Sequence, residues 1–217
     1  MNKKNPYIKG QIFHICNKSI ANFGIYKDPK NISRFMKAVY YLNNKKKKLG
    51  LAKYLRSNKN KKNQFNLLIP KPNQIVKIIA YCLMPDHYHL LIKLLKDNSL
   101  SKYISDLENS FSRYFNIKFK RKGPLWQSRF RSVEIVTDEQ LLHVSRYVHL
   151  NPTTAELVDK PEDWEFSSYK EYINNEKILK EIMTEITIKN PKVYKKFCEN
   201  QIDYQRKLKK IKKLMLE

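Results

Sequence analysis

The sequence predicts an α+β fold, a ferredoxin-like βαββαβ sandwich whose antiparallel sheet carries helices on one face. Two observations lead to it. Apolar patterns of period two and period 3.6 alternate in the order strand, helix, strand, strand, helix, strand, helix. The length of 217 residues, with 41% hydrophobic residues, suits one well-filled core. A late helix and a basic C-terminal helical extension follow the βαββαβ unit.

The first half of the unit comes from three stretches. Residues 10–18 alternate as a strand that places His14 and Cys16 on one face. His14 could approach a bound metal, but we expect it to be a sheet or rim residue. Residues 28–43 begin with Asp-Pro and carry apolar residues at helical spacing. Residues 44–63 are rich in lysine and asparagine, which predicts an exposed basic insertion, partly helical or mobile.

The second half follows the same two periodicities. We divide the chain into a domain over residues 1–175 and a basic helical extension over 176–217. The remaining expected elements are strands over 75–83, 87–92 and 129–136, a helix from Ser99 or Ser101 to about Lys120, a helix over 138–150 that stops at Asn151-Pro152, and a C-terminal helix over about 191–216.

Charge and cysteine content narrow the class of protein. Lysine and arginine number 44 against 20 acidic residues, giving a net charge of +24. This surplus favours a polyanionic partner, nucleic acid above all, although a low-GC genome would also enrich lysine. The three cysteines are widely spaced and unpaired in the sequence, which indicates reduced thiols in the cytosol. No apolar run is long enough to span a membrane, so we expect a cytoplasmic protein.

The pair His87 and His89 is the first candidate site. In a strand, alternate residues share a face, so both imidazoles leave one side while Tyr88 points to the other. Two neighbouring imidazoles are the beginning of a divalent-metal site. The competing interpretation is two half-buried histidines bonded to the backbone.

Two strings resemble one family. YCLMPDHYHLLIK, residues 81–93, resembles the H-U-H motif of HUH-type single-tyrosine transposases, with Tyr88 as a slightly polar U. The resemblance is close to the REP-associated branch (repetitive extragenic palindromes, transposase IS200-like domain), whose proteins carry an "MPNHxHLLI"-like string. RYVHLNP, residues 146–152, is similar to that family's "RYIHLNP". The resemblance spans roughly residues 10–172, and the 44–63 insertion departs from it.

The resemblance implies a site and a chemistry. Tyr147 is then the nucleophile that forms a 5′-phosphotyrosine, and His87, His89 and Asn151 hold Mg²⁺ or Mn²⁺. From the residues alone, Tyr147 is one of 14 tyrosines and is expected to be structural. His149 is expected to be a core or rim residue rather than a proton-transfer group.

Further candidates are cationic and aromatic. Arginines surround Trp126 in and beside the string GPLWQSRF, a mixture typical of single-strand binders, while a buried structural tryptophan is the alternative. We therefore list Arg121, Trp126, Arg129, Arg131 and Arg146 as candidate DNA contacts.

The function expected is a metal-dependent single-stranded DNA endonuclease and strand transferase, a transposase that cleaves near hairpin-forming DNA. Its partner would be single-stranded or hairpin DNA, and it would act as a monomer or homodimer in the prokaryotic cytosol. The alternative is a non-cleaving nucleic-acid-binding regulator that keeps the same fold. A third, weaker option is a metal phosphoesterase that uses water and forms no adduct.

Overall fold

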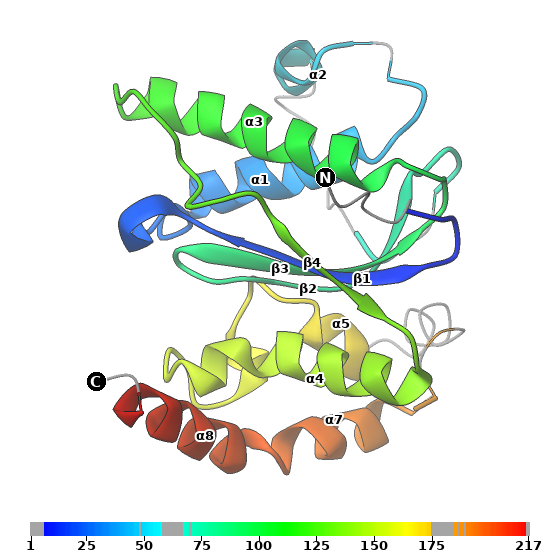
Figure 1. The fold of residues 1–217 in the computed structure, drawn as a ribbon, viewed down its shortest axis with the longest axis vertical. Helices are drawn as coiled ribbons and strands as arrows, with labels where there is room; N and C mark the ends of the chain where they lie inside the picture. Colours follow the sequence, from blue (N-terminus) through cyan, green and yellow to red (C-terminus); the bar gives the residue numbers. More distant parts are fainter. Residues whose placement is uncertain are drawn as a thin grey trace, which may run out of the picture.

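The protein, seen in a computed structural model, has an antiparallel sheet between two helical layers (Figure 1). The structure describes residues 7–47, 49–57, 67–69, 71–174, 185, 187–188 and 190–215. The prediction of an α+β fold with an antiparallel sheet is confirmed. The principal helices are α1 (Pro29–Leu42), α2 (Leu51–Ser57), α3 (Leu100–Lys118), α4 (Asp138–Thr154), α5 (Tyr169–Asn174), α7 (Pro191–Glu199) and α8 (Ile202–Leu214), with 3₁₀ turns at Ile20–Asn22 and Pro161–Asp163.

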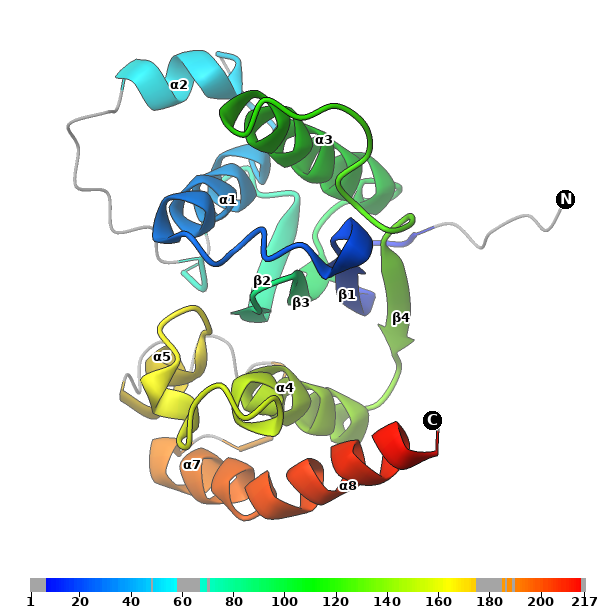
Figure 2. The ribbon, with the colours of Figure 1, turned by 90° about the vertical axis from the view of Figure 1, so that its left-hand side faces the viewer.

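The two helical layers differ in their place along the chain. Figure 2 shows α1 and α3 on one face of the sheet, while α4 and α5 cover the other face and α7 and α8 lie beyond them. The helices of the βαββαβ unit are therefore on one face, as expected, and the later helices cover the opposite face. Among the residues described, none of the helices combines the length and apolarity that a membrane crossing needs.

The sheet brings distant segments together. Its order is β2-β3-β1-β4, and every neighbouring pair is antiparallel. The first strand therefore lies between β3 and β4, with Cys16 opposite His89 on one side and opposite Arg131 on the other. The strands are β1 (Ile12–Lys18), β2 (Val76–Leu83), β3 (His87–Leu94) and β4 (Arg131–Ile135).

The helix starts follow local chemistry. The Asp28 carboxylate accepts a hydrogen bond from the Lys30 backbone N–H at 2.8 Å, so α1 is capped as the sequence indicates. At the start of α3 the Ser99 hydroxyl instead donates to the Lys96 carbonyl and caps no helical N–H. In the basic insertion, the expected partial helix is α2, and residues 58–63 lie outside the described part.

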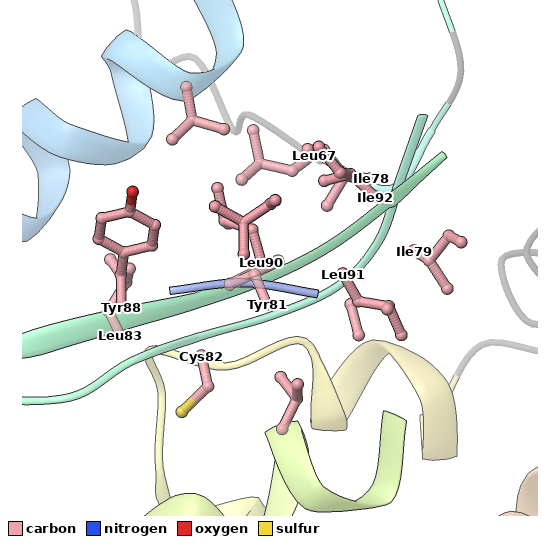
Figure 3. Packing of buried hydrophobic residues seen from close by; sticks show 14 of the residues in the cluster. Leu67, Ile78, Ile79, Tyr81, Cys82, Leu83, Tyr88, Leu90, Leu91 and Ile92 are labelled. Carbon is pink, nitrogen blue, oxygen red and sulfur yellow. The ribbon is translucent and has the colours of Figure 1, made fainter. Parts of the chain in front are cut away.

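The hydrophobic core fills both sides of the central strands. Figure 3 shows Tyr88 pointing towards the α1 side and Cys82 pointing the opposite way, towards α4. Phe35 and Phe111 are fully buried on the α1 side and meet edge to face, with ring centroids 5.3 Å apart. Aromatic burial of this kind supplies much of the hydrophobic stabilisation of a single core.

Two predicted helix ends were wrong. Helix α4 continues through Pro152 to Thr154, because the proline ring is buried and the Asn151 and Pro152 carbonyls are bonded by the N–H groups of Ala155 and Leu157. The single C-terminal helix is two helices. The Gln201 N–H bonds the Cys198 carbonyl three residues back, which tightens the backbone at the junction between α7 and α8.

The two C-terminal helices do not present one continuous apolar face to the core. Val193, Tyr204 and Ile211 are each more than half exposed, whereas Cys198 is fully buried. The break between α7 and α8 changes the direction of the helix, so one continuous stripe cannot face the core along the whole segment.

Candidate metal and tyrosine site

The direction of each motif side chain is set by β3. Tyr88 points into the α1 side, where its hydroxyl donates to the Glu108 carboxylate at 2.7 Å and its ring meets Trp126 edge to face. Asn17 donates to the same carboxylate at 2.8 Å, so the polar group of this buried position has partners. Strand alternation then directs His87 and His89 to the α4 side.

The His87 and His89 imidazoles lie close together, and each ring is hydrogen-bonded through its Nδ1 atom. Their ring centroids are 5.0 Å apart and their planes nearly perpendicular. His87 Nδ1 bonds Asp86 Oδ1 at 2.5 Å, and His89 Nδ1 bonds His14 Nε2 at 2.9 Å. This leaves Nε2 of each ring for an ion, and the buried Nε2 of His89 has no hydrogen-bond partner among the residues that the structure describes. Carboxylate or other second partners of this kind orient metal-binding histidines.

These histidines are neutral near pH 7. Burial lowers the pKa of His89 well below its ordinary value and lowers that of His14 to about 4. Burial also lowers the pKa of His87, although Asp86 opposes this by favouring the charged form. Neutral imidazole is the form that offers a lone pair to a metal.

Tyr147 lies over this group from α4. The helix begins at Thr137, whose hydroxyl accepts the Gln140 N–H at 3.1 Å. The Tyr147 ring is edge-on to the imidazoles of His89 and His14. Its ring centroid lies 5.6 Å from that of His89 and 5.9 Å from that of His14. The side chain remains 44% exposed, so the phenol is open to a substrate.

The phenol is not activated by its protein surroundings. Burial raises the pKa of Tyr147, the Cys16 and Cys82 thiols act in the same direction, and a hydrogen bond with Asn151 opposes them. Tyr147 is therefore a protonated phenol at neutral pH, and a cation beside it would favour the phenolate. Asn151 lies one turn further along α4, where its Nδ2 donates to the Tyr147 carbonyl at 2.8 Å and leaves Oδ1 as a potential ligand atom.

A second group of ligand atoms shares His89. One nitrogen of His14, the Cys16 sulfur and one nitrogen of His89 all lie within 4.8 Å of one another. His14 was expected to be a sheet or rim residue, and it does lie in the sheet, on β1, where it also belongs to this group. The signal was its position two residues from Cys16 on one face of β1, and it became informative only once β1 was paired with β3.

A cavity of about 510 Å³ opens beside the imidazoles. Two cations, Lys18 and Arg131, lie on its wall, which suits a phosphate group. The full lining is Cys16, Asn17, Lys18, His87, His89, Gln127, Ser128 and Arg131.

The candidate DNA contacts separate into two groups. Arg129 is exposed and Arg131 lines the cavity. Arg121 donates to the Asn116 side chain and the Pro124 carbonyl, and Arg146 lies over the Phe197 ring at 4.2 Å. Trp126 packs on the core, with Nε1 donating to the Glu108 carbonyl at 3.2 Å, which fits the structural alternative. For all five residues a DNA contact remains a prediction.

His149 is a core residue, one of the two expected alternatives. Its Nδ1 bonds the Tyr194 hydroxyl at 2.8 Å and its Nε2 bonds Ser168 Oγ at 2.7 Å. Burial lowers its pKa to about 3. The residue thus ties α4 to α7 and to the segment before α5, and it faces away from Tyr147.

The chain is similar to transposases of a known family. Residues 53–151 match the family described as Transposase IS200 like, so the resemblance inferred from the two motifs is confirmed. A Haemophilus influenzae protein whose name assigns it to the REP-associated tyrosine transposases is 31% identical over 101 residues. That match covers 42% of this chain and 57% of the relative, so it spans little more than half of the relative's length.

A solved structure gives the same answer for the fold. The chain superposes on a REP-associated tyrosine transposase bound to a REP hairpin with a TM-score of 0.57 and 18% identity. The superposition covers 81% of this chain and 86% of the other. At this identity the likeness establishes the shared fold.

Proposed function

Because residues 53–151 match the family described as Transposase IS200 like, we propose that this chain is a metal-dependent enzyme that nicks and rejoins single-stranded DNA through Tyr147. The observation that carries the proposal is the position of the Tyr147 ring, edge-on over His89 at 5.6 Å between centroids. A phenol and a paired-imidazole site on a ferredoxin-like βαββαβ unit are the components such a reaction needs.

The residues present fit a divalent ion. Asp86 and His14 occupy the Nδ1 atoms, so His87 and His89 would both bind through Nε2. Within the described part of the chain, the buried Nε2 of His89 has no hydrogen-bond partner. Asn151 would add its amide oxygen, and three ligands leave positions open for phosphate oxygens. A bound Mg²⁺ or Mn²⁺ would supply Lewis-acid stabilisation of the charge that develops on the phosphate.

Tyr147 carries out the covalent step. Its oxygen forms a bond to phosphorus, the phenol gives up its proton, and the bond from phosphorus to the 3′ oxygen breaks. The departing 3′ oxygen takes up a proton, and the 5′-phosphate remains on Tyr147. The phosphodiester energy is kept in the new ester, so attack by another 3′-hydroxyl rejoins DNA without ATP.

Hairpin-forming DNA is the proposed substrate. The net charge of +24 suits a polyanion, and Lys18 and Arg131 on the cavity wall are placed to bind phosphate oxygens near His87. The printed description of the structural relative, bound to a REP hairpin, supports the same class of ligand.

Adduct formation tests the proposal. A hairpin oligonucleotide with a 3′ label is incubated with the protein and Mn²⁺, and denaturing electrophoresis detects label bound to protein. We expect an adduct with the wild type, none in EDTA and none with Tyr147→Phe. Tyr204→Phe is the matched control, because Tyr204 is an exposed tyrosine on α8, and it should form the adduct normally.

The other outcomes identify the alternatives. An adduct that survives Tyr147→Phe contradicts the assignment of the nucleophile. Released DNA without an adduct favours a phosphoesterase that uses water, and hairpin binding without cleavage favours the regulator.

A further inference from the structure

The group His14, Cys16 and His89 has a different chemical character from the pair His87 and His89. A thiolate and two imidazoles are ligands for borderline-soft ions such as Zn²⁺, whereas Mg²⁺ prefers oxygen. The structure places these three donors on neighbouring strands, with Cys16 directly opposite His89 and His14 two residues along β1.

We propose that His14, Cys16 and His89 form a second metal site, specific for a thiophilic divalent ion such as Zn²⁺, which competes with the catalytic ion for His89. The donor atoms lie within 4.8 Å of one another, and His14 Nε2 is 2.9 Å from His89 Nδ1. Ligands of a tetrahedral zinc ion are roughly 3.3 to 3.7 Å apart, as its bond lengths require. Small side-chain rotations would therefore produce the site.

The fourth coordination position of such an ion would be open to the cavity. Cys16 and His89 both line the cavity beside the imidazoles, so water or an anion can reach an ion bound between them. Three protein ligands and one open position are typical of accessible zinc sites.

Competition follows from the tautomer of His89. A neutral imidazole has one nitrogen with a lone pair and one that carries a proton. Nδ1 faces His14, so binding the thiophilic ion there requires the proton on Nε2, the atom that the catalytic ion would use. This antagonism rests on the proposed function, whereas the second site itself depends only on the three donors.

Cobalt provides a direct spectroscopic test of the site. Metal-free protein is titrated with Co²⁺, and the near-ultraviolet band of a cobalt thiolate is recorded. We expect one equivalent to produce the band in the wild type and in His87→Ala. Cys16→Ser and His14→Ala should lose it, and Cys16→Ala serves as a second variant should Cys16→Ser fail to fold.

Cys198→Ser is the matched control, because Cys198 is a buried thiol on α7, away from the three donors. It should keep the band. A band that persists without Cys16, or one that disappears in His87→Ala, overturns the proposal.

Competition is measured in the adduct assay, with each variant as its own reference. Adding Zn²⁺ to the Mn²⁺ reaction should lower adduct formation at least tenfold in the wild type and much less in Cys16→Ser. Equal inhibition of both contradicts the antagonism. If no ion supports an adduct, the proposed function fails, and the cobalt band alone decides whether the second site exists.

Discussion

The two faces of the sheet are built from different residues, although the same strands supply both. The face under α1 and α3 holds aromatic packing around Phe111, with the Glu108 carboxylate bonded by Tyr88 and Asn17. The face under α4 holds every histidine of the chain, with three on the strands and two on α4 itself. A one-residue change of strand register would move the packing residues to the α4 side and the strand histidines to the α1 side. Strand alternation therefore keeps the aromatic packing and the histidines on opposite faces of the sheet.

Buried polar atoms without a hydrogen-bond partner among the described residues occur on both faces. On the α1 side they are Tyr26 Oη and Arg34 Nη1, and on the α4 side His89 Nε2 is one. His89 lines the cavity beside the imidazoles, so its Nε2 atom is placed to meet a ligand there.

The largest expected effect is the loss of stability caused by a cavity on the α1 side. Phe111→Ala removes a fully buried ring that contacts Phe35 and Trp126, so we expect the free energy of unfolding to fall by about 3–5 kcal/mol. Urea denaturation measures it. Ile117→Ala on the same helix is the control, because Ile117 is 73% exposed and should change stability by less than about 0.5 kcal/mol. A loss below about 1 kcal/mol for Phe111→Ala would show that this face is not the stabilising one.

The second expected effect is acid sensitivity of the α4 side. Burial holds the pKa of His149 at about 3, below its unfolded value of 6.5, so the unfolded chain binds a proton first as pH falls. Stability is therefore fully present above the unfolded pKa and is lost below it. Between pH 7 and pH 5 the loss is about 2 kcal/mol from this histidine. His14, with a pKa of about 4, acts in the same direction.

Urea denaturation of metal-free protein at both pH values measures this loss. His149→Gln should show a smaller decrease in the free energy of unfolding than the wild type, by about 2 kcal/mol. His143→Gln is the control, because His143 is exposed on the same helix. An unchanged pH dependence in His149→Gln would mean that this residue does not titrate on unfolding.

The third effect concerns metal binding and catalysis rather than stability. Asp86 orients His87 through Nδ1, and Asp86→Ala should weaken Mn²⁺ binding and adduct formation by roughly 10- to 100-fold, with little change in stability. Asp86→Asn keeps an acceptor oxygen and should fall between. Calorimetric Mn²⁺ titration measures the affinity, with Asp106→Ala, which removes an exposed ion pair, as control. If Asp86→Ala lowers stability and leaves affinity intact, the two faces are less distinct than proposed.

How far the sequence predicts these features depends on how local their causes are. The opposite directions of Tyr88 and His89 follow from alternation within one strand, and the sequence predicted the strand. His14 belongs to the group with Cys16 and His89 because β1 lies beside β3. This pairing joins residues about 75 positions apart, so no local sequence pattern predicts it.

Local rules also failed where tertiary contacts outweighed them. A proline normally stops a helix, but the buried ring of Pro152 and the bonded carbonyls around it keep α4 intact for two more residues. For Trp126 the sequence left a stacking role and a structural role open, and its ring lies against Tyr88 and Phe111. Composition cannot distinguish the two roles because both favour a large aromatic ring.

The tyrosine between the two histidines has an evolutionary consequence. Its hydroxyl and the Asn17 amide hold down the pKa of a Glu108 carboxylate that burial raises. A descendant with phenylalanine at position 88 would keep the buried Glu108 carboxylate but lose one of its two side-chain hydrogen-bond donors. Positions 88 and 108 should therefore drift as a pair, so that an apolar residue between the histidines accompanies an uncharged residue on α3.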